Sequence, residues 1–298
     1  MSIDIVIKQK GFSKKPLPLS VLTGGELAYG TYENGYRLNV GKIEGEEIML
    51  FHPDHIGRGF SVTWTPDEKK QLVLRALNPT CADELRDFYA VVARITKHWK
   101  CSLTVDGNRT TPEKFQRGLD DMLRANDSYL NLFISEALKK DEYGSIVLYS
   151  ALWPMDFGAK EAKMVSEAPE GAPARFARWL HEMQSVDAYY AVAGYFDDPK
   201  GIYGRLAFTE GCRSLFPVKP SVPFGLVDSH TGRALECDKY ELYLYSTSLE
   251  SHLGTVDYTK FINALDPAKV SCYDTGHVMI EAHDLEEMKE LLKRMQEG

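Results

Sequence analysis

The chain has 298 residues, of which 44% are hydrophobic and 26% charged, and its net charge is −8 with a pI near 5.6. These values are normal for a globular protein and argue against wholesale disorder. The acidic balance predicts no nucleic-acid partner and no membrane-surface role, because both surfaces are negatively charged. One basic cluster (Lys8, Lys10, Lys14 and Lys15) is interpreted as a solvated face.

No export signal or membrane span is predicted. The N-terminus lacks a charged leader followed by a long apolar run, and no stretch approaches the about 18 apolar residues of a spanning helix. The five cysteines are scattered and form no C-x-x-C pair, so reduced thiols in a cytoplasmic protein are expected. No cofactor is predicted.

The first half of the chain is predicted to contain both strands and helices. Ile3, Ile5 and Ile7 alternate with mostly polar neighbours over residues 2–8, which is typical of a half-buried strand. Asn34-Gly35 predicts a hairpin turn, because both central positions need positive φ. Further strands are expected at residues 60–65, 71–77, 101–105 and 145–152, and helices at 80–99, 111–122 and 128–138.

Residues 156–173 are rich in Ala, Glu, Gly and Pro and form the best candidate for a linker. Beyond it, residues 187–196 are apolar on both faces, which predicts a central strand. The final helix should begin with a capping box made by Asp284 and Glu287. Other strands are expected at residues 202–208, 222–227, 239–247, 270–273 and 277–282, and helices at 176–183 and 258–265.

The predicted strands follow one another in groups instead of alternating strictly with helices, and several have one polar face. That favours an α+β fold with antiparallel or mixed β-sheets and helices packed on one side. Two similar-sized halves, residues 1–155 and 174–298, are predicted. A single continuous domain is the alternative.

Motifs that depend on local sequence, such as phosphate loops, nucleophile elbows and H-E-x-x-H, do not occur. The densest polar group is His52, Asp54 and His55, followed by Arg58. Two imidazoles and a carboxylate could ligate a divalent metal, with Arg58 holding an anionic substrate. A turn between two strands explains the same residues.

Two further groups could belong to a site. Alternation places His277, Glu281 and His283 on one strand face, where the last two could share a proton or a metal. Tyr243 and Tyr245 share a polar strand face, and tyrosines there are typical of recognition surfaces. A solvated face in the first case, and internal hydroxyl partners under a helix in the second, are the alternatives.

Several segments resemble an uncharacterised bacterial family of proteins of about this length, catalogued as a domain of unknown function. They are the runs at residues 19–22, 26–30, 56–59, 79–80 and 84–89, with Trp99. The resemblance is clearest over the first half and implies a bacterial cytoplasmic setting. It implies no activity or catalytic residue, but it marks Gly57-Arg58-Gly59 and the helix ending at Trp99 as family features.

Two functions follow as hypotheses. The first is a non-catalytic binding module whose partner could be another protein, using an exposed sheet face or the surface around residues 52–58. The second is a metal-assisted hydrolase or other small-molecule enzyme with a site assembled from scattered residues. Catalytic residues, ligand and oligomeric state are not predicted.

Overall fold

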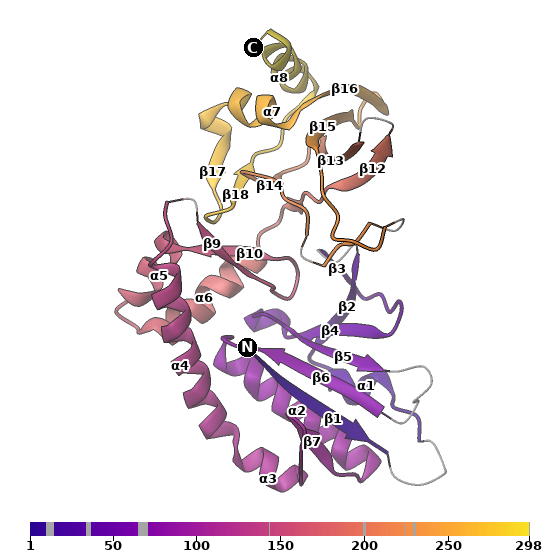
Figure 1. The fold of residues 1–298 in the computed structure, drawn as a ribbon, viewed down its shortest axis with the longest axis vertical. Coiled ribbons are helices and arrows are strands. Elements are labelled where there is room, and N and C mark those ends of the chain that lie inside the picture. Colours follow the sequence, from indigo (N-terminus) through magenta and orange to yellow (C-terminus); the bar gives the residue numbers. More distant parts are fainter. Residues whose placement is uncertain are drawn as a thin grey trace. The chain divides into compact units, whose positions relative to one another are not determined.

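The computed structural model describes residues 1–9, 15–33, 37–64, 71–142, 144–198, 201–223, 225–228 and 231–297. The chain forms two compact units, unit 1 (Met1–Val186) and unit 2 (Asp187–Gly298) (Figure 1). The predicted turn at Asn34-Gly35 lies outside the described residues, as do Lys10 and Lys14 of the basic cluster. No helix in the described ranges is long and apolar enough to cross a membrane.

An antiparallel sheet with the strand order β3-β2-β4-β5-β6-β1-β7-β8 forms the centre of unit 1. Its members are β1 (Ser2–Lys8), β2 (Ala28–Glu33), β3 (Arg37–Val40), β4 (Glu47–Phe51), β5 (Phe60–Trp64), β6 (Gln71–Leu77), β7 (Leu103–Val105) and β8 (Asn108–Thr110). The predicted strand at residues 2–8 is confirmed. Its isoleucines Ile3, Ile5 and Ile7 are buried because alternation turns all three toward the core.

Helix α2 covers one face of this sheet (Figure 1). The helices of unit 1 are α1 (Leu19–Thr23), η1 (Pro53–His55), α2 (Ala82–Trp99), α3 (Pro112–Arg117), α4 (Leu119–Ala137), α5 (Ala159–Ser166) and α6 (Ala172–Gln184). The ring of Phe88 meets that of Phe60 edge-on, with 5.4 Å between the ring centroids. Cys81 is the N-cap residue of α2 and makes no side-chain capping bond.

The helices predicted at residues 111–122 and 128–138 are divided differently. Thr111 caps α3 by accepting a hydrogen bond from the amide of Lys114 at 3.2 Å. This helix ends at Arg117, and α4 then runs unbroken from Leu119 to Ala137. The residues predicted as one helix at 111–122 therefore belong to two helices.

The stretch predicted as a linker contains regular structure. Strands β9 (Ser145–Leu148) and β10 (Met155–Gly158) form a hairpin, and α5 follows directly. Phe157 and Val165 are completely buried there. The two units divide the chain between Val186 and Asp187 instead, while a division into separate domains stays a prediction.

Unit 2 contains two four-stranded mixed sheets, each with one parallel pair. One has the order β11 (Tyr189–Tyr190), β14 (Ser214–Pro217), β18 (His277–Ile280), β17 (Val270–Cys272), and the other β12 (Gly194–Asp198), β13 (Gly201–Thr209), β15 (Lys239–Ser246), β16 (Ser251–Asp257). Its helices are α7 (Tyr258–Ala264), η2 (Pro267–Lys269) and α8 (Leu285–Glu297). A core containing Phe208, Leu242 and Met288 joins sheet and helices, and the α+β prediction is confirmed.

Two strand predictions in unit 2 are wrong. Residues 187–196 form no central strand but contribute to two edge strands, β11 and β12, because the chain changes sheet between them. Described residues between 222 and 227 form an isolated bridge from Val227 to Ala234 instead of a strand. The capping box of α8 is confirmed, with Asp284 and Glu287 exchanging hydrogen bonds of 2.9 Å.

Candidate functional site

The buried guanidinium of Arg58 is the feature of unit 1 that packing explains least. Arg58 is 7% exposed and lies between η1 and β5. Its Nε donates to the carbonyl of Tyr149 at 2.9 Å, and Nη1 donates to the carbonyl of Pro79 at 3.3 Å. Nη2 forms no hydrogen bond with any residue that the structure describes. The buried guanidinium of Arg58 therefore has N–H donors that make no hydrogen bond to a described residue.

Arg58 lines a small cavity of about 90 Å³. The other lining residues are Tyr32, Met49, Leu77, Tyr149, Ser150 and Pro154. The hydroxyl of Tyr32 is already engaged, because it lies 2.9 Å from the carbonyl of Ser150 and 3.1 Å from that of Ala151. The side chain of Ser150 donates to Leu148. Arg58 is thus the charged group among the described lining residues, which are mostly apolar.

Glu84, on α2, lies beneath the loop between η1 and β5 that carries Arg58, and it is 2% exposed. Its Oε2 accepts the amide of Gly59 at 2.7 Å, and its Oε1 accepts the hydroxyl of Thr80. Burial raises the pKa of Glu84, while these hydrogen bonds and the charge of Arg58 oppose the shift. Burial also lowers the pKa of Arg58 to about 10, opposed by the charge of Glu84. Each ion thus stabilises the other's charged form.

Two glycines let the backbone of this loop approach the carboxylate. A Cβ atom at Gly57 would lie 2.5 Å from Oε2 of Glu84, closer than atoms can pack. Gly59 has a φ of 69°, and a Cβ there would lie 2.6 Å from Sδ of Met49. A side chain at either position would displace the loop that carries Arg58.

A third polar residue ties α4 to the segment before α2. The side chain of Asn126 accepts a hydrogen bond from the amide of Thr80 and donates one to its carbonyl, both at 2.9 Å. Asn126 is 3% exposed. Glu84 therefore contacts the loop directly, whereas Asn126 fixes Thr80, whose hydroxyl accepts the amide of Arg58 at 3.4 Å. Neither Glu84 nor Asn126 was among the predicted site residues.

The predicted group at residues 52–55 forms a surface dyad and not a metal-binding cluster. The rings of His52 and His55 stack with centroids 4.0 Å apart, and Nε2 of His55 lies 2.6 Å from a carboxylate oxygen of Asp87. The carboxylate of Asp54 is exposed. Nδ1 of His181 accepts the amide of Ile56 at 3.1 Å. Side chains that contact residues 55 and 56 therefore come from α2 and α6.

Within each unit taken alone, the described residues contain no three His, Cys, Asp or Glu side chains whose ligand atoms all lie within 4.8 Å. Metal ligation by His52, Asp54 and His55 therefore lacks geometric support.

In unit 2, Tyr243 and Tyr245 lie half-buried on the face of β15 that is opposite to the core. Tyr243 stacks on His252, with ring centroids 4.2 Å apart. Nearby, the guanidinium of Arg205 lies 5.2 Å from the ring of Tyr203 and donates to Glu241 at 3.0 Å. The guanidinium of Arg205 is therefore paired largely by residues of this same face.

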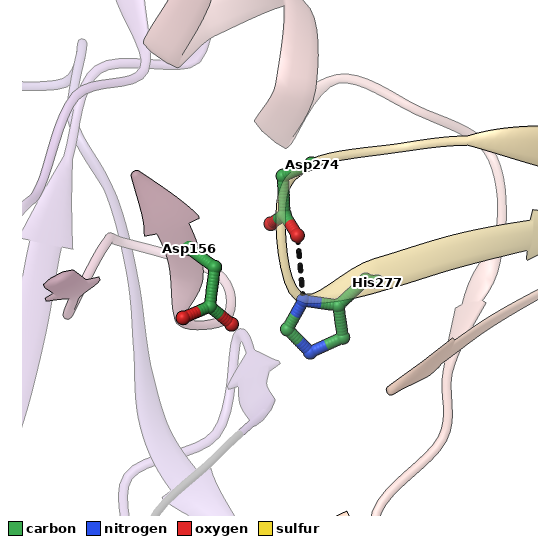
Figure 2. A group of neighbouring side chains, drawn as sticks. All are labelled: Asp156, Asp274 and His277. Carbon is green, nitrogen blue, oxygen red and sulfur yellow. Dashed lines mark hydrogen bonds and ion pairs between the residues drawn. The ribbon is translucent and has the colours of Figure 1, made fainter. Parts of the chain in front are cut away.

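The predicted group at residues 277–283 is dispersed. Glu281 forms an ion pair with Arg213, while Nδ1 of His283 contacts the backbone carbonyl of Glu281 at 2.8 Å and not its carboxylate. His277 is buried, and its Nδ1 lies 2.9 Å from Asp274, as the dashed line in Figure 2 marks. Its Nε2 lies 3.0 Å from the hydroxyl of Tyr190. The three predicted residues thus face different partners.

Comparison with known proteins places the chain in one family. A family model described as Domain of unknown function (DUF4299) matches residues 2–291. No curated protein and no solved structure matches the chain. The expected resemblance to a family of this kind is confirmed, and it extends well beyond residue 155. The bacterial origin that was expected with it stays a prediction.

Proposed function

The chain belongs to the family described as Domain of unknown function (DUF4299), and for it we propose a non-catalytic binding function in which unit 1 holds a small carboxylate at Arg58. The observation that carries this proposal is a guanidinium, 7% exposed, with a nitrogen unpaired among the described residues, lining a cavity. Burying a cation costs free energy unless it is paired. A bound anion supplies that pairing.

The chamber favours a carboxylate over larger anions. Its volume of about 90 Å³ is the room of roughly three water molecules. One edge of a guanidinium matches the two oxygens of a carboxylate, and the small volume leaves less room for the bulkier, tetrahedral phosphate group. Met49, Leu77 and Pro154 offer apolar contact to a short tail. A monocarboxylate of a few carbons therefore fits both charge and shape.

The direct test is a titration of the full chain with acetate, butyrate and benzoate, using acetamide and butyramide as neutral controls. Heteronuclear NMR of the arginine side chains reports on Arg58 without a mutation. We expect the guanidinium signals of Arg58 to shift with butyrate and to stay in place with butyramide. Equal responses to acid and amide, or an unmoved Arg58 signal, would contradict the proposal.

A conservative variant separates charge from geometry. Arg58→Lys keeps the positive charge but loses the planar fork, so butyrate should bind about tenfold more weakly. Thermal unfolding of the variant shows whether the fold is retained. If it is not, the guanidinium shifts of the unaltered chain decide the question alone.

A second candidate function rests on the dyad of His55 and Asp87. A histidine oriented by a carboxylate at 2.6 Å is the usual arrangement of a general base, which would act here on water in a hydrolase. The nearby hydroxyl of Thr80 and thiol of Cys81 are buried, and burial raises the pKa of the thiol. Water is therefore the nucleophile that this base would activate. Ester hydrolysis that disappears in His55→Gln and persists in His98→Gln would favour this candidate.

We also place the protein in the cytoplasm as part of the proposal. Cys81, Cys101, Cys212, Cys237 and Cys272 are free thiols, as expected for a reducing compartment. Titration of the denatured protein with a thiol reagent, after rapid isolation from cells, should give five thiols. Fewer would contradict this placement.

A further inference from the structure

A second cavity opens on the solvent face of the sheet in unit 1, opposite to the core. It has a volume of about 430 Å³, which lies in the range of small-molecule sites. Strands β1, β6, β7 and β8 and residues beside them line it. The lining side chains are Val6, Lys8, Gln9, Gln71, Ser102, Thr104 and Arg109.

Strand register explains why these side chains meet. The isoleucines of β1 point into the core, so Val6 and Lys8 point outward. Lys8 pairs with Gln71 of β6, and Val6 pairs with Thr104 of β7. Thr104 in turn pairs with Arg109 of β8. The long cationic side chains of Lys8 and Arg109 therefore lie on either side of Thr104, because β1 and β8 flank β7 in the sheet.

The charge of this groove runs against that of the chain. Lys8 and Arg109 are exposed, none of the lining residues that the structure describes is acidic, and the protein as a whole has a net charge of −8. Asp4 follows on the same face of β1, but its carboxylate accepts Nε of Arg75 at 2.5 Å. Arg109 forms no ion pair with any residue that the structure describes. The described lining therefore carries two cationic side chains and no carboxylate.

The uncharged lining adds hydrogen-bond donors and a firm wall. Ser102 and Thr104 supply hydroxyls, and Gln71 supplies an amide. Gln9 is 8% exposed and is held in place because its Nε2 donates to the carbonyl of Lys15 at 2.5 Å and its Oε1 accepts the amide of Lys15 at 2.9 Å. The groove is thus built from fixed strands and a locked glutamine.

We propose that this groove binds a small molecule bearing a phosphate group, with the phosphate between Lys8 and Arg109 and the remainder along Gln71 and Thr104. Arginine and lysine together match a phosphate, which offers several oxygens and up to two negative charges. The volume leaves space for a further group of sugar size. This site is separate from Arg58 and uses different residues, so either proposal can fail without the other.

The probes are inorganic phosphate and glycerol phosphate, titrated into the full chain at constant ionic strength and followed by amide NMR. We expect the amides of Ser102 and Thr104 to shift, with glycerol phosphate binding more tightly than phosphate. Arg109→Ala should weaken glycerol phosphate about tenfold, because it removes a charge-assisted contact. Thr104→Val, nearly the same in shape, should weaken it less.

Lys97→Ala is the matched control, because Lys97 is exposed on α2, has no ion pair among the described residues and does not line the cavity. It should leave the affinity within about twofold, as a surface change away from the contact does. Equal weakening by Lys97→Ala and Arg109→Ala would show general attraction to a positive charge on the protein and overturn the proposal. Absence of amide shifts at Ser102 and Thr104 would overturn it as well.

Discussion

The amide of Gly59 donates a hydrogen bond of 2.7 Å to Oε2 of Glu84, so the first turn of α2 holds the loop that carries Arg58. The loop contributes backbone and the helix contributes a buried carboxylate. This contact joins segments 25 residues apart and is one of the hydrogen bonds that fix the candidate site.

Gly59→Ala tests how tightly that loop is constrained. The substitution places a side chain at a φ of 69° and a Cβ 2.6 Å from Sδ of Met49. We expect the free energy of unfolding to fall by about 2–4 kcal/mol, from backbone strain together with overpacking. Urea unfolding measures it. Gly107→Ala is the control, since φ is 81° there with nothing within 4 Å, and it should cost about 1 kcal/mol. Equal losses would show that the contact with Met49 is unimportant.

Glu84→Gln tests the buried acid through the pH dependence of stability. Because burial raises the pKa of Glu84 above its ordinary 4.5, the folded protein binds this proton more tightly than the unfolded chain. This contribution is therefore fully present below pH 4.5 and is lost as pH rises through the folded pKa. Relative to Glu84→Gln, the unaltered chain should lose stability as pH rises above 4.5 and through the pKa of the folded state. A difference that stays constant over this range would contradict the assignment.

Carboxylate binding at Arg58 predicts stabilisation by ligand. A ligand that binds only the folded state should raise the free energy of unfolding by about 2.7 kcal/mol at a hundred times its Kd. Thermal unfolding in butyrate, with butyramide as the control, measures this. Arg58→Lys should lose most of the effect. A rise of equal size in both additives would indicate a solvent effect.

Tyr190→Phe tests the buried hydrogen bonds of unit 2. The hydroxyl of Tyr190 lies 3.0 Å from Nε2 of His277, and the substitution removes this buried hydrogen bond. We expect a loss of about 1 kcal/mol in the free energy of unfolding. Tyr203→Phe is the control, since the Tyr203 ring is half-buried and its hydroxyl bonds to no described residue, and it should change stability by less than about 0.5 kcal/mol. Indistinguishable variants would assign no role to this contact.

Regular segments could be predicted from the sequence because their signals are local. Alternation at Ile3, Ile5 and Ile7 and the capping box at Asp284 and Glu287 each depend on neighbours within a few residues, and both are confirmed. The strand at residues 187–196 failed because its apolar run fits either one central strand or two short edge strands. Periodicity alone cannot separate these arrangements.

Arg58 could be singled out from its sequence, but its surroundings could not. The carbonyl that holds its Nε belongs to Tyr149, which is 91 residues away, and no local pattern joins the two. Glu84 did leave a signal that was overlooked. It precedes Phe88 by one helical turn on the buried stripe of α2, and a carboxylate at such a position indicates a buried polar contact.

The paired hydrogen bonds between Asn126 and Thr80 have a consequence for the protein during storage. Deamidation would convert Asn126 to aspartate and set a carboxylate oxygen against the Thr80 carbonyl, where the amide now donates. The side chain is 3% exposed within α4, so the reaction needs a local opening of that helix. Samples aged at alkaline pH should therefore accumulate a less stable species, and peptide mapping would find the change at this asparagine.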